Sequence, residues 1–203
     1  EILPSDWSSD VCSSDLSCCP ITYNIAVPHT FGANMQRDYG DAKYIVNFGH
    51  NLFEGIDISK TKKLAKAASR EDVKLLVLDP RFSTVASKAD EWLPIKPGTD
   101  AAFLMALIHV WLRDNKYDKK FIEQYAVGLE ELRESVKDTT PLWQEAITGI
   151  KADKVERIAN EIYAAAPAVV IDWGHKTTTA KAEYIRTRAI LPKIGRASCR
   201  ERV

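Results

Sequence analysis

Short runs of apolar and β-branched residues recur along the middle of the chain. Continuous runs of this kind are typical of strands that are buried on both faces of a parallel sheet. Between the first two runs, residues 61–71 carry apolar side chains at helical spacing, so strand, helix and strand form a β-α-β unit. The predicted strands are KYIVNFG (43–49), VKLLVLD (73–79), EWLPI (91–95) and AVVIDWG (168–174).

Other segments have the apolar spacing of helices. The longest apolar run, AAFLMALIHVWL (101–112), is shorter than the roughly 20 residues that span a bilayer, so it predicts a buried helix. Thr99 or Asp100 can cap this helix. Strands that alternate with helices predict an α/β fold with a mostly parallel sheet. Further helices are predicted at 118–126, 129–138, 142–149, 179–191 and 152–166, the last with Val155, Ile158, Ala159 and Ile162 on one face.

The two ends of the chain differ from the rest. Residues 6–16 are rich in Ser and Asp, residues 194–203 are rich in Arg, and neither stretch has apolar periodicity. Both can be written as in-frame translations of common DNA-sequencing adapters that share a reverse-complementary segment. We therefore expect 1–16 and 194–203 to be adapter-derived and 17–193 to be an internal fragment of a longer protein. A disordered tail at each end is the alternative.

Charge and cysteine content narrow the classes of function. Lys+Arg and Asp+Glu both number 28, so nothing indicates a nucleic-acid partner or an acidic membrane surface. The hydrophobic fraction of 45% is that of an ordinary domain with a core. The four cysteines contain no CxxC pair, and their spacing alone indicates unpaired thiols; they are Cys12, Cys18, Cys19 and Cys199.

Polar loops follow all four predicted strands, and in open parallel sheets ligands bind at this carboxyl edge. GHN (49–51) predicts a tight turn with free backbone N–H groups for a phosphate, although GxGxxG is absent. Asp79 can accept hydrogen bonds from a ribose or a purine edge, Arg81 can hold a phosphate, and Asp100 can pair with a guanine edge. The four loops are FGHNLFEG (48–55), DPRFS (79–83), KPGTD (96–100) and WGHKTT (173–178).

Each of these residues alone also has a structural interpretation. Gly49 suits a turn, Asp79 and Asp100 suit caps, and Arg81 suits a surface charge. Four such loops on one edge favour a nucleotide-like ligand. The remaining candidates have structural interpretations that need no ligand. We interpret His50 and His175 as solvated loop histidines, His109 as a satisfied core histidine, and Trp92, Trp111 and Trp143 as packing residues.

Three stretches resemble a known family. FGHNLFEG, LDPRFSTVASKADEWLPIKPGTDAA and YDKKFIEQYAVG are similar to molybdopterin oxidoreductases of the dimethyl-sulfoxide-reductase type, most of all to the catalytic subunits of thiosulfate and polysulfide reductases. The resemblance implies molybdenum held by two molybdopterin guanine dinucleotides, and a Rossmann-like domain that binds the guanine end of one. The implied cofactor-binding residues are Gly49, His50, Asn51, Glu54, Asp79, Pro80, Arg81, Ser83, Pro97, Gly98, Thr99, Asp100, Gly174 and His175.

The resemblance also gives the clustered cysteines a role. Members of this branch carry a Cys, SeCys or Ser ligand to molybdenum shortly before the first strand, where SCCPITYNIAVPHTFG (17–32) lies. A thiolate is a soft ligand that coordination deprotonates. Cys19, which Pro20 follows, is the predicted metal ligand and catalytic residue, and Cys18 is the second choice. Two plain buried thiols are the alternative.

The implied function is two-electron reduction of a sulfur compound such as thiosulfate, polysulfide or tetrathionate. The resemblance further implies a 4Fe-4S cluster in an N-terminal part of the parent, an electron-transfer iron–sulfur subunit, a membrane anchor subunit, and a place in the bacterial periplasm. Because the iron–sulfur cysteines and further pterin domains are not in these 203 residues, we expect this chain alone to be inactive. The alternatives are a formate, nitrate or arsenate enzyme of the same family, and a non-catalytic nucleotide-binding module.

Overall fold

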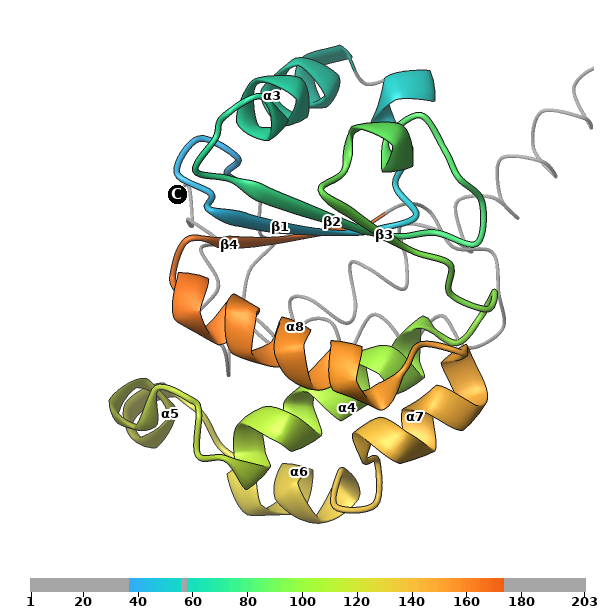
Figure 1. Ribbon diagram of the computed structural model, residues 1–203. Coiled ribbons are helices and arrows are strands. Elements are labelled where there is room, and N and C mark those ends of the chain that lie inside the picture. The colour runs from blue at the N-terminus through green and yellow to red at the C-terminus, as the bar shows by residue number, and fades with distance from the viewer. Residues whose placement is uncertain (1–36, 56–57, 174–203) are drawn as a thin grey trace, which may run out of the picture.

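The computed structural model of the chain describes residues 37–55 and 58–173 (Figure 1). Its strands form one parallel sheet in the order β3-β2-β1-β4. Each strand lies inside the run predicted for it, and the α/β class is confirmed. This order is also how the Rossmann sheet begins. The strands are β1 (Tyr44–Phe48), β2 (Lys74–Leu78), β3 (Glu91–Leu93) and β4 (Val169–Trp173).

Helices cover both faces of the sheet, which is why its strands have continuous apolar sequences. One face carries α3 (Ile58–Ala68) and the 3-10 helices η1 (Leu52–Glu54) and η2 (Ala86–Lys88) (Figure 1). The other face carries α4 (Asp100–Arg113), α5 (Lys119–Tyr125), α6 (Leu129–Ser135), α7 (Pro141–Thr148) and α8 (Ala152–Ala165).

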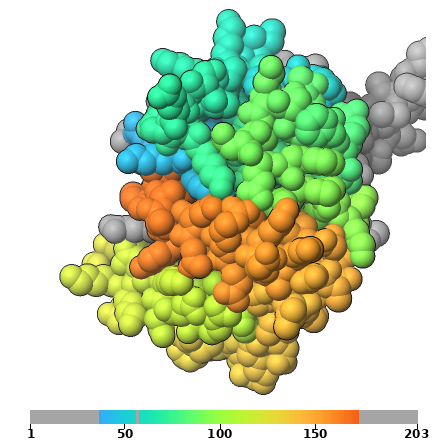
Figure 2. Space-filling view, in the orientation of Figure 1, coloured from blue at the N-terminus to red at the C-terminus, as the bar shows by residue number. Residues whose placement is uncertain are grey.

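The core is split by the sheet into two apolar clusters. Successive side chains of a strand point to opposite faces. Ile45 therefore packs in one cluster with Leu64 of α3, whereas Val46 packs in the other with residues of α4 and α8. Figure 2 shows α8 and α7 as a band that separates the segment around α3 from α5 and α6. The buried face of α8 consists of the four residues predicted, Val155, Ile158, Ala159 and Ile162.

The ends of several helices differ from the prediction, and α6, predicted at 129–138, ends at Ser135. Helix α3 begins at Ile58 and ends at Ala68, whereas the periodic pattern indicated 61–71. Thr99 is the residue before α4, but its hydroxyl donates to the carbonyl of Lys96 at 2.7 Å and makes no capping bond. The predicted helix at 179–191 lies outside the described residues.

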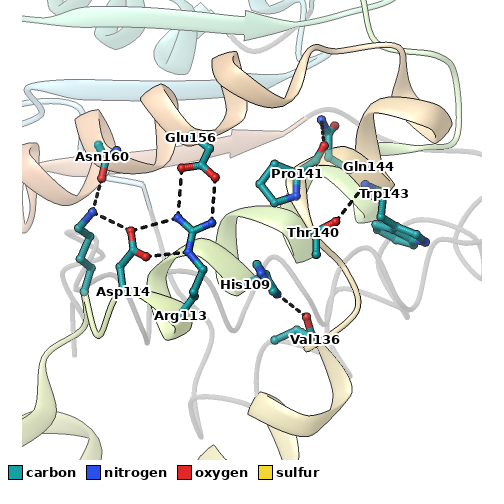
Figure 3. A network of polar contacts seen from close by, with 11 residues as sticks. His109, Arg113, Asp114, Val136, Thr140, Pro141, Trp143, Gln144, Glu156 and Asn160 are labelled. Atoms are coloured by element: carbon teal, nitrogen blue, oxygen red, sulfur yellow. Dashed lines mark hydrogen bonds and ion pairs between the residues drawn. The ribbon is translucent and has the colours of Figure 1, made fainter.

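The interface of α4 with its neighbours holds several polar contacts (Figure 3). Arg113 binds both carboxylate oxygens of Glu156 on α8, at 2.9 and 3.1 Å. The Nδ1 atom of His109 lies 2.8 Å from the carbonyl of Val136, so this histidine is satisfied as predicted, but it is half-buried and does not lie in the core. The Nε1 atom of Trp111, which is buried, donates to the carbonyl of Ala159 at 2.8 Å, in line with its predicted packing role.

The packing role predicted for Trp143 is wrong. The residue is 37% exposed and lies in the first turn of α7, next to the buried Gln144. Trp92 is half-buried and packs against the α3-side cluster. Within 37–55 and 58–173, no helix has both the length and the apolar content needed to cross a membrane.

Candidate functional site

The order of the strands places a topological switch point between β1 and β4. The chain moves outward from β1 to β2 and β3, and then returns to the other side of β1 as β4. In open α/β sheets, ligands bind outside the carboxyl ends of the strands at such a reversal. The loops after β1, β2 and β3 all leave the sheet at this edge because the strands are parallel.

The turn after β1 has the tight geometry that the GHN motif predicts. Gly49 has a φ of 59°, in the left-handed region that glycine adopts at no steric cost. The backbone N–H of His50 is not free, however: it donates to Oδ1 of Asn47 at 2.9 Å. This part of the phosphate-turn prediction is wrong. The reason is that Asn47 is fully buried in β1, and a buried amide must satisfy its own oxygen.

Hydrogen bonds join the turn after β1 to the loop after β2. Oδ1 of Asn51 accepts from the backbone N–H of Val85 at 3.3 Å. Glu54 accepts from the hydroxyl of Thr84 and pairs with Arg81 at 3.1 Å. The Thr84 hydrogen bond, and with it the charge of Arg81, lowers the pKa of the Glu54 carboxyl. The structure thus brings together the residues that the sequence predicted in two separate loops.

Asp79 and Arg81 differ in their surroundings. Asp79 is 8% exposed, and its Oδ1 accepts the backbone N–H of Arg81 at 2.9 Å, which closes the turn. Its carbonyl accepts from Nε1 of Trp92. The Arg81 side chain is 69% exposed, so its guanidinium is accessible although it is paired with Glu54. Pro80 between them is exposed.

Ser83 is buried, and its hydroxyl oxygen accepts the backbone N–H of Ala86 at 3.4 Å, which makes it part of the entry to η2.

The turn after β3 is tied to the helical layer. The backbone N–H of Lys96 donates to the carbonyl of Thr148, the last residue of α7. Pro97 is exposed, Gly98 has a φ of 80°, and Thr99 is half-buried. Asp100 is 6% exposed and is the first residue of α4, where the positive end of the helix dipole favours a carboxylate.

The sequence patterns did not lead us to predict two buried polar residues that lie at this edge. Asn47 and Asp172 are both fully buried and lie opposite each other in β1 and β4. Asp172 also pairs with Arg37 at 2.8 Å and with Nδ1 of His50 at 2.9 Å. A signal was present: each is a polar residue at the next-to-last position of an otherwise apolar strand.

Tyr39 completes this buried group. It is 2% exposed, and its hydroxyl has no hydrogen-bond partner of normal geometry among the described residues. Burial, and then the negative charge of Asp172, raises the pKa of this phenol well above its usual range. Tyr39 therefore stays neutral beside the Asp172 carboxylate.

The side chains at the described edge differ in charge and in hydrogen-bonding character. In the part of the chain that the structure describes, no three His, Cys, Asp or Glu side chains are placed to hold a metal. Arg81 and His50 suit phosphate oxygens, whereas Asp79 and Asp100 suit the hydroxyl and N–H donors of a ribose and a base. The predicted metal ligand Cys19, the alternative Cys18, and the pterin-side residues Gly174 and His175 lie outside the described residues.

Comparison with known proteins places the chain in a family. Residues 2–192 match the family described as Molybdopterin oxidoreductase, and the chain belongs to it. The matched range includes most of 1–16, whose adapter origin stays a prediction. The resemblance seen in the sequence is thus confirmed.

Two curated relatives and one solved structure are similar to most of this chain. The thiosulfate reductase molybdopterin-containing subunit PhsA of Salmonella typhimurium is 39% identical over 174 residues, which are 86% of this chain and 23% of that protein. The acetylene hydratase of Syntrophotalea acetylenica is 38% identical over 168 residues, or 81% of this chain and 23% of that one. The solved structure of acetylene hydratase from Pelobacter acetylenicus superposes with a TM-score of 0.83 at 32% identity. It covers 89% of this chain, which spans 25% of that structure.

Proposed function

We propose that the chain is part of the catalytic subunit of a molybdenum-dependent oxidoreductase, and that the carboxyl edge of its sheet binds the guanine end of a molybdopterin guanine dinucleotide. The observation that carries this proposal is the convergence of the loops after β1 and β2, which are held together by hydrogen bonds that Glu54 and Asn51 accept. Family membership supports the pterin part of the assignment.

The proposal gives each loop a separate part of the nucleotide. Arg81 and the turn from Gly49 to Asn51 bind the diphosphate, with Glu54 holding Arg81 in place. Asp79 accepts from the ribose, and Asp100 accepts from the guanine edge at the start of α4. Pro80, Ser83, Pro97, Gly98 and Thr99 shape these loops, and Gly174 and His175 approach the pterin nearer the metal.

Cys19 is the proposed molybdenum ligand, with Cys18 as the second choice. When bound, the molybdenum–pterin group supplies the two-electron redox chemistry, and the protein supplies binding and orientation. The parent enzyme then also carries a 4Fe-4S cluster and works with an electron-transfer subunit and a membrane anchor subunit.

The proposed substrate class is a sulfur compound such as thiosulfate, polysulfide or tetrathionate. The similarity to a thiosulfate reductase subunit supports this choice. An arsenate enzyme is the second candidate, favoured by the arsenate respiratory reductase subunit ArrA of Shewanella, which is 31% identical over 159 residues.

Nucleotide binding to the 203-residue chain tests the site. Guanine offers two N–H donors that a carboxylate accepts together, whereas hypoxanthine lacks the exocyclic amino group. We expect guanosine 5′-diphosphate (GDP) to bind about tenfold more tightly than inosine 5′-diphosphate, and Asp100→Asn to remove most of this preference, since charged hydrogen bonds contribute about 1.5–3 kcal/mol. Isothermal titration calorimetry measures both affinities.

A matched control is available on another helix. Asp153 is the acidic residue in the first turn of α8 and is exposed, so Asp153→Asn changes the same kind of side chain away from the site. This variant keeps the full preference for GDP if the proposal holds. Equal binding of the two nucleotides to the unmodified chain contradicts the guanine assignment.

A further inference from the structure

The carboxylate of Asp172 is buried at the switch point between β1 and β4, and polar groups surround it. Arg37 lies 2.8 Å from Oδ1, and Nδ1 of His50 lies 2.9 Å from the same oxygen. Nδ2 of Asn47 donates to Oδ2 at 3.2 Å. A charge that is wholly removed from water costs several kcal/mol unless it is paired in this way. Such a costly arrangement beside a ligand-binding edge suggests a role beyond packing.

The side chain of Asn47 forms hydrogen bonds with both the N–H and the carbonyl of His50. Its Oδ1 accepts the N–H of His50 at 2.9 Å, and its Nδ2 donates to the carbonyl of His50 at 3.0 Å. The ring of the same residue is held by Asp172. Backbone and ring of His50 are therefore fixed by two neighbouring strands, although the residue itself is in a loop.

The partner of Nδ1 determines which ring nitrogen is available to a ligand. A carboxylate only accepts hydrogen bonds, so Nδ1 of His50 carries the hydrogen and Nε2 is the nitrogen that points away from Asp172. The side chain of His50 is 19% exposed, whereas that of Asp172 is fully buried. A ligand at this edge can therefore contact the ring of His50 but not the carboxylate of Asp172.

We propose that Asp172 is a positioning residue that acts through His50, and that Nε2 of His50 donates a hydrogen bond to a phosphate oxygen of the nucleotide. This rests on the proposed function, because the ligand is the diphosphate of the guanine dinucleotide. With Nδ1–H directed at Asp172, a hydrogen bond donated by Nε2 requires a hydrogen on both ring nitrogens in the complex. The Asp172 carboxylate and a phosphate oxygen can accept these two hydrogens on opposite sides of the ring.

The other groups around the pair leave this mechanism in place. Arg37 shares Oδ1 of Asp172 with His50 and offsets part of its charge. Tyr39 stays neutral because burial raises the pKa of its phenol. Asn47 carries no charge and donates to the second oxygen of Asp172. Oδ1 of Asp172 thus faces both Arg37 and the ring of His50, and its Oδ2 faces the amide of Asn47.

Nitrogen-15 NMR of the histidine rings in the 203-residue chain tests the positioning role, with His50→Gln used to assign the signals. We expect Nδ1 of His50 to carry a hydrogen in the free chain, and both ring nitrogens to carry one with GDP bound. Asp172→Asn provides an amide in place of the carboxylate, so we expect the preference for Nδ1–H to be lost. A purely structural Asp172 leaves the His50 tautomer unchanged, and that result overturns the inference.

Binding measurements test the contact with phosphate. We expect His50→Gln and Asp172→Asn each to weaken GDP binding about tenfold while guanosine binds as before, because guanosine lacks the phosphate. His109→Gln is the matched control, since Nδ1 of His109 is also bonded, to the carbonyl of Val136 on the other face of the sheet. Circular dichroism establishes that each variant is folded, and His50→Gln carries the test if Asp172→Asn unfolds.

The outcomes separate this inference from the function on which it rests. If the unmodified chain binds neither GDP nor guanosine, the proposed nucleotide site is wrong and the inference falls with it. If GDP binds and Asp100→Asn removes the guanine preference, but His50→Gln binds GDP as tightly as the unmodified chain, only the role of His50 is wrong.

Discussion

Asn47 and Asp172 face each other across two neighbouring strands, 125 positions apart in the sequence. Each residue places a polar side chain inside a sheet that is otherwise apolar. Burial of an unpaired amide or carboxylate is unfavourable, and burial of a paired one is close to neutral. The stability of this part of the sheet therefore depends on keeping all the partners together.

Replacement of Asn47 tests this dependence. In Asn47→Leu, a carboxylate oxygen of Asp172 and both backbone groups of His50 lose a partner. We expect the free energy of unfolding to fall by about 2–4 kcal/mol in urea denaturation. Asn160→Leu is the control: Asn160 is exposed and accepts from Lys116, so its replacement changes stability by less than about 0.5 kcal/mol. Equal effects of the two substitutions contradict the argument.

At this scale the sequence predicts the loop residues better than the strand residues. Gly49, Asp79 and Arg81 are recognisable because turn formers and charged side chains follow apolar runs. Asn47 and Asp172 were passed over because each lies within such a run. Their pairing depends on which strands become neighbours, and this is decided by the fold and not by local sequence.

At the scale of elements, a charged cluster attaches α8 to the amino-terminal part of the sheet. Arg157 binds Glu91 of β3 at 2.6 Å and Glu161 of its own helix at 2.7 Å. Lys74 and the Tyr44 hydroxyl also bond to Glu161, at 2.7 and 2.9 Å. Burial raises the pKa of Glu161, but these three hydrogen bonds lower it by more, so the pKa lies below the ordinary 4.5.

The lowered pKa determines how the stability depends on pH. In the unfolded chain Glu161 titrates near its ordinary value of 4.5, and in the folded chain it stays ionised to a lower pH. Its contribution to stability is therefore complete above the unfolded value and is lost as the pH falls through the folded value. Because Arg157 is 40% exposed and screened by water, we expect Arg157→Met to lower the unfolding free energy by only about 1 kcal/mol at pH 7.

Thermal or urea unfolding at pH 7 and at pH 3 measures this effect. The loss in Arg157→Met becomes smaller as the pH falls, because Glu161 then loses its charge in the folded chain as well. Lys137→Met, which removes an exposed pair with Glu134, is the control and changes stability little at either pH. A loss in Arg157→Met that is the same at both pH values excludes the ionic cluster as its cause.

The existence of the elements follows from the pattern of apolar residues, whereas their ends do not. All four strands and the buried face of α8 agree with the prediction because burial requires apolar side chains at those positions. The prediction missed the start of α3 because its first residue, Ile58, is 68% exposed and does not extend the buried apolar pattern. The hydroxyl of Thr99 bonds to Lys96 because the turn before α4 places that carbonyl within reach.

At the scale of the whole molecule, the sheet separates two chemically different layers. The α3 side carries the loops after β1 and β2 and the buried polar group around Asp172. The other side is a helical layer held by apolar packing and by pairs such as Arg113 with Glu156 (Figure 3). The chain spans about a quarter of the length of the relatives it matches.

Mapping of GDP on the 203-residue chain by backbone amide NMR tests the central claim most directly. The proposed site predicts that the largest changes in chemical shift fall on the loops that follow β1, β2 and β3, around His50, Arg81 and Asp100. In the helical layer, we expect changes at the start of α4 and none in α5, α6 or α7. Changes confined to the helical layer, or no changes at millimolar GDP, contradict a nucleotide site at the carboxyl edge of the sheet.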